Sequence, residues 1–455
     1  MNIIVFSGGT ATNSLTLCFK RMCLEKKNGE AGTEGNLSYI LPISDNGGST
    51  SEILRVFGGP AIGDIRSRIT RVINDEHLKF FYSYRLSEVE SEAKAEWIEI
   101  IGGNHKIWAD ISIELKDLLR SFLISIQSEI LKRSKTSMNS FNFAKASVGN
   151  LFLSSVRIFI GGSLDSSVEL MMRIGRADKN VNVIPCINTN HTHHISALLA
   201  NGDIITGQSQ ISHPSPVSTD SDNEANNFSK QFVHLNEKFA KTTLETNYEQ
   251  EDFAIPAYIL PELRSSQLYF TKLYEDAMLP VKVEKIFYIN PYGEEIRPHG
   301  NGRVINKIIE SDMIVYSIGS LMTSLIPTII LGNVAQTIYL SHSNTIKKIL
   351  LINNKYDRET LGLTGYNYVK FIVDSMKNSL LEYSAKKLSK TELQTLSEKI
   401  MWNSFITDIV CLEHSEIKID PADFRKHGLN IHTIDSNVME NDSLATVLTE
   451  IHNNR

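Results

Sequence analysis

The chain contains few cysteines, and they follow no metal-binding pattern. Only four of the 455 residues are cysteine, namely Cys18, Cys23, Cys186 and Cys411. No pair has the CxxC spacing typical of a zinc site, and the positions do not suggest a disulfide framework. Cys18 and Cys23 fall in a predicted helix, where we expect packed and unreactive thiols.

A basic surplus and long apolar runs are also missing. The formal net charge is −6, so composition gives no support for nucleic acid as the main partner. The most apolar stretches, "NLFLSSVRIFI" and "LMTSLIPTIIL", are interrupted by Arg157 and Pro327 and are shorter than the roughly 20 residues that cross a bilayer. The first residues lack the basic and apolar regions of a secretory signal. We therefore expect a cytoplasmic protein with no membrane partner.

Two common nucleotide-binding motifs are absent. The segment "GGTATN" at 8–13 lacks the third glycine of the GxGxxG dinucleotide motif. No Gly-Lys-Ser/Thr follows it, so it is not a Walker A loop. These differences disfavour a dehydrogenase with a degenerate dinucleotide turn.

What the chain does have is an alternation of strand-like and helix-like segments. "NIIVF" and "SYILPI" are short apolar runs, and "NSLTLCFKRMCLEK" between them has helical spacing. This strand–helix–strand order predicts parallel pairing. Further apolar runs, "NVNVIPC", "VEKIFYIN", "DMIVYSI", "KKILLIN" and "DIVCLE", alternate with helical patterns and indicate an α/β fold.

The chain is interpreted as one α/β domain, residues 1–455, with three distinctive parts. Residues 75–140 are amphipathic and lack strand signals, which predicts a helical insertion with a solvated charged face. Residues 213–252 are rich in Ser, Asn and acidic residues, which predicts a flexible loop. Residues 371–455 are expected to form a mainly helical extension packed on the core. Asn201-Gly202 predicts a hairpin turn.

Three glycine-containing turns follow predicted strands: "SGGTAT", "DNGGST" and "SIGSLMTS". Ligands of open parallel sheets bind beyond the carboxyl ends of the strands, so these turns should meet at one edge. A glycine turn that opens a helix exposes backbone N–H groups, which suits a phosphate. For any single turn, however, a tight bend without a ligand is the simpler interpretation.

Asp45 and Asp64 are the carboxylates that we pair. Two carboxylates and substrate phosphates commonly hold Mg²⁺. A helix cap or an Asx turn is the alternative for each, and spacing alone favours that alternative. Arg66 is placed to reach a phosphate, whereas Arg68 and Arg71 are expected at the surface.

Other polar and aromatic clusters are interpreted as structural. "NHTHH" at 190–194 has three histidines without a nearby carboxylate or cysteine, so a solvated or hydrogen-bonded cluster is favoured over a metal site. Trp108 and the aromatic residues of "FFYSY" at 80–84 are expected in the core.

Taken together, the motifs resemble the CofD/YvcK family, which contains 2-phospho-L-lactate transferases and YvcK-type factors that bind UDP-sugars. The family's "GGTG", "DDGGSSG", "PGDIRN" and "HSFGNL" are similar to "GGTA", "DNGGSTS", "IGDIRS" and "ASVGNL" here. Its "GPGSLYTSIIPNLL" is similar to "SIGSLMTSLIPTIIL". The order of the motifs is preserved from residue 3 to about residue 370.

The resemblance implies a Rossmann-like fold, with a mainly parallel sheet covered by helices on both faces and a nucleotide diphosphate in its cleft. It also implies Mg²⁺, on Asp45 and Asp64, and transfer of a phospholactyl group from a guanosine diphosphate-linked donor to a deazaflavin alcohol. The expected partner is a nucleotide-linked small molecule, and a homodimer is left open. The residues expected to bind the nucleotide are Gly8, Gly9, Thr10, Thr12, Asn46, Gly47, Gly48, Ser49, Arg66, Asn150, Gly319, Ser320, Thr323 and Ser324.

The chain departs from the family pattern at several positions. Asn46 replaces the second aspartate of the "DD" pair, Ala11 replaces the last glycine of the first turn, and Ala146 replaces the histidine before "SVGNL". Loss of an acid at Asn46 favours binding or altered chemistry. Two functions therefore stay open: transfer of a phosphorylated group, with catalytic residues unassigned, and non-enzymatic binding of a UDP-sugar by a metabolic regulator.

Overall fold

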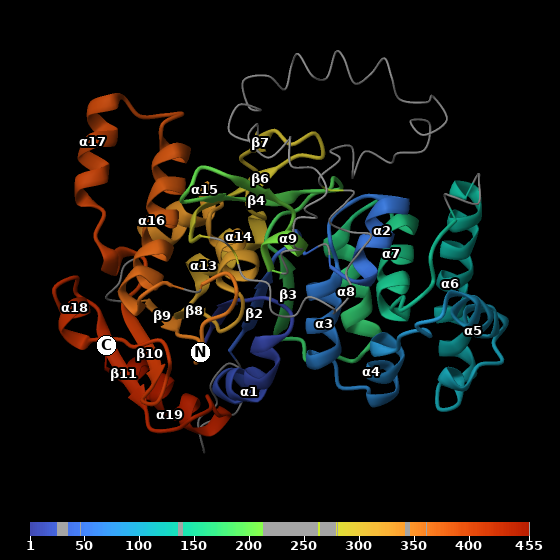
Figure 1. The fold of residues 1–455 in the computed structure, drawn as a ribbon. Coiled ribbons are helices and arrows are strands. Elements are labelled where there is room, and N and C mark those ends of the chain that lie inside the picture. The colour runs from blue at the N-terminus through green and yellow to red at the C-terminus, as the bar shows by residue number, and fades with distance from the viewer. Residues whose placement is uncertain are drawn as a thin grey trace, which may run out of the picture.

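The computed structural model of the chain is shown in Figure 1. It describes residues 1–24, 35–45, 47–134, 140–212, 263, 279, 281–341, 346–360 and 362–454. The predicted loop at 213–252 lies outside the described residues, as does Asn46.

Among the described residues, seven strands form a parallel sheet in the order β11-β10-β9-β8-β1-β2-β3. Most of these strands are buried along their length, as parallel strands covered by helices on both faces should be. The predicted Rossmann-like α/β fold is confirmed. The strands are β1 (Ile3–Phe6), β2 (Leu37–Leu41), β3 (Val181–Pro185), β8 (Met313–Tyr316), β9 (Lys347–Leu351), β10 (Asp408–Leu412) and β11 (Asn430–Ile434).

The strand order reverses direction at β1. β2 and β3 extend the sheet on one side of β1, whereas β8, β9, β10 and β11 extend it on the other. The chain therefore leaves β1 and β8 in opposite directions, which makes the edge beyond these two strands a topological switch point. In open α/β sheets this is the place where ligands bind.

A smaller antiparallel sheet has the order β5-β4-β6-β7. The predicted hairpin is confirmed, since β4 pairs with β5 and Gly202 in the turn has φ 89°. The strand predicted from "VEKIFYIN" belongs to this second sheet. Its strands are β4 (His194–Leu199), β5 (Ile204–Thr206), β6 (Val283–Ile289) and β7 (Glu295–Ile296).

Helices cover the main sheet and connect its strands (Figure 1). Within the described residues no single helix is long and apolar enough to cross a bilayer, although the bent pair Leu321–Ile329 and Gly332–Leu340 meets both criteria together. The helices outside residues 75–140 and before residue 365 are α1 (Thr16–Leu24), α2 (Ser49–Phe57), α3 (Gly63–Val72), α7 (Val148–Phe159), α8 (Leu164–Ile174), α9 (Gln208–Ser212), α13 (Gly302–Glu310), α14 (Ile326–Ile329) and α15 (Gly332–Leu340). Short turns η1 (Ala11–Leu15) and η7 (Leu321–Leu325) follow β1 and β8.

The segment predicted as a helical insertion contains α4 (Glu76–Ser83), α5 (Glu90–Gly102), η2 (Lys106–Trp108) and α6 (Ile113–Arg133). Asp75 and Ser112 cap α4 and α6 through their side-chain oxygens. Figure 1 shows α5 and α6 beyond α7, away from the sheet. Phe81, Tyr82 and Trp108 are buried, as predicted, whereas Phe80 is exposed and Tyr84 is only partly buried, so the prediction that the aromatic residues of 80–84 belong to the core is wrong for Phe80.

The C-terminal part of the chain is mainly helical and contains the strand predicted from "DIVCLE" as β10, but it also contains β11, which was not predicted. It contains α16 (Gly365–Ser384), α17 (Lys390–Lys399), η8 (Trp402–Ser404), α18 (Pro421–Arg425) and α19 (Asn441–Asn453), but it also adds β10 and β11 to the sheet. This part therefore forms one edge of the sheet instead of only packing on it. The sequence of β11, "NIHTI", is polar because an edge strand is exposed on one side, and it gave no clear strand signal.

All four cysteines are buried and free. Burial raises the pKa of the Cys18 and Cys23 thiols to about 12. Since the thiolate is the reactive form, these thiols are unreactive near neutral pH, as the sequence predicted.

Candidate functional site

The turns after β1 and β8 interlock. A Cβ atom added to Gly8 would lie 2.5 Å from Ser324 Oγ, so only glycine permits this approach. Thr12 is buried, and its Oγ1 contacts Ser317 Oγ at 2.9 Å and donates to Ile318 O at 3.0 Å. The Thr12 hydroxyl thus joins the two turns, whereas Thr10 is exposed at the edge.

Gly9 packs directly against Asp64 at the start of α3. A Cβ atom at Gly9 would lie 2.5 Å from Asp64 Oδ1 and 2.6 Å from Asp64 Cα. The Gly9 backbone N–H opposes the rise in the pKa of the Asp64 carboxyl group. The glycines were expected to let a phosphate approach the backbone; in the structure they let the turns approach one another.

Asp45 and Asp64 meet between the second turn and α3. Their carboxyl groups interact directly, and the Gly47 N–H donates to Asp45 Oδ1 at 3.1 Å. Burial raises the pKa of both groups, and the charge of Asp45 helps to raise the pKa of Asp64 to about 8. Two adjacent carboxyl groups share one proton at neutral pH unless a cation balances their charge.

Several oxygen atoms near these strand ends lack partners. Among the described residues, Ser7 Oγ, Ser44 Oγ and Gln208 Oε1 are buried without a hydrogen bond. Gln208 Oε1 is 3.6 Å from the position of a Cβ atom on Gly47, so it lies beside the second turn. Carboxylate and amide oxygens are ligands that Mg²⁺ prefers. The residues present therefore fit the expected magnesium ion.

A hydrogen-bonded chain connects α3 with the second turn. Arg66 Nε donates to Asn150 Oδ1 at 3.1 Å, and Asn150 Nδ2 donates to Ser49 Oγ at 3.0 Å. Burial, followed by the charge of Arg85, lowers the pKa of Arg66 to about 10, so it remains a cation at neutral pH. Its terminal nitrogens make no hydrogen bond within the described part of the chain. The structure thus brings Arg66, Asn150 and Ser49 together and leaves a guanidinium edge for an anion.

The prediction that Arg68 lies at the surface is wrong. The Arg68 side chain is fully buried, with its Cζ 4.4 Å from the centre of the Tyr39 ring. Its terminal nitrogens donate to Gly8 O at 3.2 Å and to Thr16 Oγ1 at 3.3 Å. Arg68 therefore holds the first turn through its bond to Gly8 O. Its burial is possible because Tyr39 in β2 and Thr16 in α1 supply the partners that a buried arginine needs. Arg71 on the same helix is exposed, as predicted.

The second turn leads into α2. Gly48 precedes this helix with φ 57°, a left-handed conformation that favours glycine. Gly47 and Ser49 are partly buried, and Gly48 is exposed. The contact between Asp45 and the Gly47 N–H is also the geometry of an Asx turn, so Asp45 shapes the turn in addition to facing Asp64.

A fourth segment reaches this edge, and sequence reasoning missed it. The loop after β9 carries Asn353 and Glu359, whose side chains hydrogen-bond to the turn after β8. The only available signal was position, since this loop also follows a parallel strand beside β8. Its sequence, "NNKYDRET", has the composition of an ordinary polar loop.

The histidine cluster does not form a metal site within the described residues. His194 is buried on β4, His191 is exposed, and His193 Nδ1 contacts His191 O at 3.1 Å. Among the described residues, one group of three metal-ligating side chains does lie close together elsewhere, and it is exposed: Glu413, His414 and Asp435. The interpretation of "NHTHH" as a hydrogen-bonded cluster agrees with this geometry.

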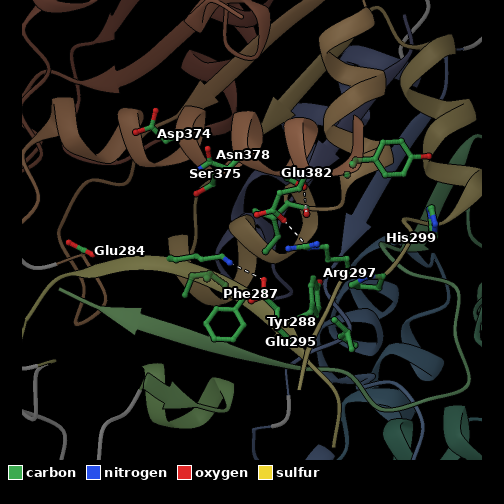
Figure 2. A pocket seen from close by; sticks show the side chains of 18 of the residues that line it. Glu284, Phe287, Tyr288, Glu295, Arg297, His299, Asp374, Ser375, Asn378 and Glu382 are labelled. Atoms are coloured by element: carbon green, nitrogen blue, oxygen red, sulfur yellow. Dashed lines mark hydrogen bonds and ion pairs between the residues drawn. The ribbon is translucent and has the colours of Figure 1, made fainter. Parts of the chain in front are cut away.

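A separate groove lies between the small sheet and α16 (Figure 2). It has a volume of about 360 Å³. Its charged side chains largely pair with each other: Lys285 with Glu295 and Arg297 with Glu382, both at 2.9 Å. The groove is lined by Ile330 and Gly332, which follow the C-terminal end of α14. The turn after β8 precedes the N-terminal end of the same helix.

Comparison with known proteins identifies the family of the chain. The family model described as 2-phospho-L-lactate transferase CofD matches residues 3–445. The chain belongs to the CofD family. An uncharacterized protein of Saccharomyces cerevisiae, YNL011C, is 54% identical over 457 residues and covers 99% of both chains.

Two more distant similarities cover part of the sequence or the fold alone. A putative gluconeogenesis factor of Aquifex aeolicus is 32% identical over 138 residues, which cover 29% of this chain and 36% of that protein. A crystal structure of a UPF0052 family protein from Bacillus halodurans has a TM-score of 0.56 at 14% identity and covers 98% of both chains. This last similarity shows the fold alone.

Proposed function

We propose that this CofD family protein binds a nucleotide-linked diphosphate together with Mg²⁺, in the cytoplasm, where the turns after β1, β2 and β8 meet. The observation that carries the proposal is the contact between Gly9, Asp64 and Asp45 at the switch point of the sheet. Three separate segments supply these residues: the turn after β1, the turn after β2 and the start of α3. A ligand at that edge would face backbone N–H groups, a guanidinium and two carboxyl groups at once.

The side chains have distinct roles in this proposal. Arg66 offers its terminal nitrogens to a phosphate oxygen, while Asn150 holds its Nε in place. Asp45 and Asp64 hold the metal, because their carboxyl groups are adjacent and otherwise must share a proton. Arg68 stabilises the negative charge of Asp64, since a nearby guanidinium favours the ionised carboxylate.

The family suggests transfer of a phosphorylated group to a hydroxyl acceptor. The acceptor oxygen would form a bond to the distal phosphorus, the bond from that phosphorus to the bridging oxygen would break, and a nucleoside monophosphate would leave. The acceptor hydroxyl would release its proton to the surrounding water, and the leaving nucleoside monophosphate would keep the electron pair of the broken bond. Bound Mg²⁺ would neutralise the charge that develops on the phosphate oxygens. Such reactions depend mainly on positioning and electrostatics, which Arg66, Asp45 and Asp64 are placed to supply.

Non-enzymatic binding of a UDP-sugar is the second candidate. Asn46 stands where the resemblance places an acid, which removes one group that could accept a proton. Similarity to a protein described as a putative gluconeogenesis factor also favours this candidate. Release of a nucleoside monophosphate from a nucleotide-linked donor would support the transferase; binding without turnover across a panel of hydroxyl acceptors would support the regulator.

The binding proposal is tested by calorimetry of the full-length protein with UDP- and GDP-linked compounds, with and without Mg²⁺. A ligand at a hundredfold excess over its dissociation constant stabilises the folded state by about 2.7 kcal/mol, so thermal unfolding provides a second readout. We expect at least one compound to bind in a Mg²⁺-dependent manner. Absence of binding and of any thermal shift across the panel would refute the proposal.

A further inference from the structure

Glu359 binds the turn after β8 from a different loop. Its carboxylate accepts hydrogen bonds from Ser320 Oγ at 2.5 Å and from Thr323 Oγ1 at 2.9 Å. It also accepts the Met322 N–H at 3.1 Å. Only 5% of Glu359 is exposed, so the carboxylate is covered by the turn that it holds.

The loop that carries Glu359 is itself held in one conformation. Asp357 Oδ1 accepts the N–H groups of Glu359 and Thr360, at 3.1 and 2.9 Å. Asn353 makes two bonds to Gly319, from its Nδ2 to Gly319 O at 2.7 Å and from the Gly319 N–H to its Oδ1 at 3.0 Å. The loop after β9 therefore fixes the turn after β8 at both of its ends.

These contacts divide the hydroxyls of the turn into two groups. Ser320 and Thr323 are hydrogen-bonded to Glu359, and Ser212 Oγ donates to Thr323 Oγ1 at 3.3 Å. Ser324 makes no side-chain hydrogen bond within the described residues, and its Oγ lies against Gly8 in the first turn. Of these three hydroxyls, only that of Ser324 is thus left to face a ligand between the first and third turns.

We propose that Glu359 is a positioning residue for the ligand site: it occupies the hydroxyls of Ser320 and Thr323 and holds the third turn so that Ser324 and the backbone face the phosphates. This inference rests on the proposed function and refines it, because it withdraws two hydroxyls that sequence reasoning assigned to the nucleotide.

The geometry of the buried carboxylate supports a specific role over general packing. Burial, and then the charge of Asp357, raises the pKa of Glu359. A buried acid is costly to maintain, and a glutamine of the same shape cannot accept from all three donors without presenting its NH₂ group to one of them. The carboxylate is therefore the group that matches this set of donors.

The first test does not need a ligand. Hydrogen exchange followed by mass spectrometry is measured on the unliganded full-length protein and on Glu359→Gln, Glu359→Ala and Glu413→Gln, the last being an exposed control at the same edge of the sheet. We expect peptides that cover 319–325 to exchange at least about tenfold faster in both Glu359 variants and unchanged in the control. Unchanged exchange in the Glu359 variants would overturn the inference whether or not a nucleotide binds.

The second test is a double-mutant cycle on the nucleotide that the wild-type protein binds, with UDP and GDP plus Mg²⁺ as the first probes. We expect Glu359→Gln to weaken binding about tenfold, and Ser320→Ala to add little in that background because the two groups act together. Ser324→Ala should weaken binding in the wild-type background and should weaken it less in Glu359→Gln, because the Ser324 hydroxyl is then no longer held toward the ligand. Additive effects of Ser320→Ala and Glu359→Gln would show that Ser320 contacts the ligand directly, and would overturn the inference.

Failure of wild-type binding alone would count against the proposed function, while the exchange result would still decide the role of Glu359.

Discussion

Asp45 and Asp64 lie 19 positions apart in sequence, yet their carboxyl groups interact directly. Asp45 follows β2, and Asp64 lies in the first turn of α3. Neither the turn nor the helix requires this contact on its own. The pair is therefore the part of the candidate site that depends most directly on how distant segments pack.

Replacing one member of this pair separates its effect on stability from its effect on ligand binding. In unliganded protein at pH 7.5, Asp64→Asn should be as stable as the wild type or more stable by about 1 kcal/mol, because it relieves the repulsion between two buried acids. The same variant should lose the Mg²⁺-dependent part of nucleotide binding. Urea denaturation and calorimetry measure the two effects, with the exposed Asp110→Asn as control; retained Mg²⁺ dependence would make the pair purely structural.

Gly9 should not tolerate a methyl group. Gly9→Ala places Cβ within 2.6 Å of the Asp64 backbone, which cannot move away as a flexible side chain can. We expect the free energy of unfolding to fall by about 1–3 kcal/mol, and we expect weaker nucleotide binding. Gly302→Ala is the matched control, since its Cβ would meet nothing within 4 Å at the start of α13; it should be neutral or stabilise the fold by about 0.4–1 kcal/mol. Equal stability of the two variants would contradict the packing argument.

Arg66 should contribute more than its positive charge. Arg66→Lys keeps a cation but loses the planar group that donates to Asn150 and offers two further nitrogens. The dissociation constant of the nucleotide, measured by calorimetry, should rise about tenfold, which corresponds to about 1.4 kcal/mol. Arg71→Lys, an exposed change on the same helix, should leave the dissociation constant unchanged. If the two variants bind alike, Arg66 does not contact the ligand.

The buried Lys348, outside the candidate site, should make the free energy of unfolding depend on pH. Its Nζ donates to Ile338 O at 2.8 Å, Ser341 O at 2.9 Å and Ser404 O at 2.6 Å, yet burial lowers its pKa to about 7. Between this value and the unfolded value of about 10.4, the unfolded chain binds more protons than the folded one. The free energy of unfolding should therefore rise with pH in this window, by up to about 1.4 kcal/mol per pH unit, and gain nothing more from Lys348 above it.

The measurement is a series of urea denaturations between pH 7 and 10. Lys348→Met should flatten the rise, although it also leaves three backbone carbonyls without their donor and lowers stability throughout. Lys347→Met, at the half-exposed neighbouring position, should keep the wild-type slope. A wild-type slope in Lys348→Met would assign the pH dependence to other groups.

Much of the framework was predictable from the sequence. The apolar runs "NIIVF", "DMIVYSI" and "KKILLIN" identified buried parallel strands, and Asn201-Gly202 identified a hairpin, because strand burial and turn conformation follow from short-range patterns. The order of strands and helices implied that the glycine turns lie at the carboxyl ends of neighbouring strands. That much places Gly8, Asp45 and Ser320 at one edge of the sheet.

The tertiary structure decided how polar groups are used at that edge. Arg68 and Glu359 have the same local signals as surface residues, and β11 is too polar to read as a strand. Whether a charged side chain is buried depends on donors and acceptors from segments far away in the chain, such as Tyr39 for Arg68 and Thr323 for Glu359. Sequence patterns report the conformation of a segment, whereas the cost of desolvating a charge is met only by the partners that the complete fold provides.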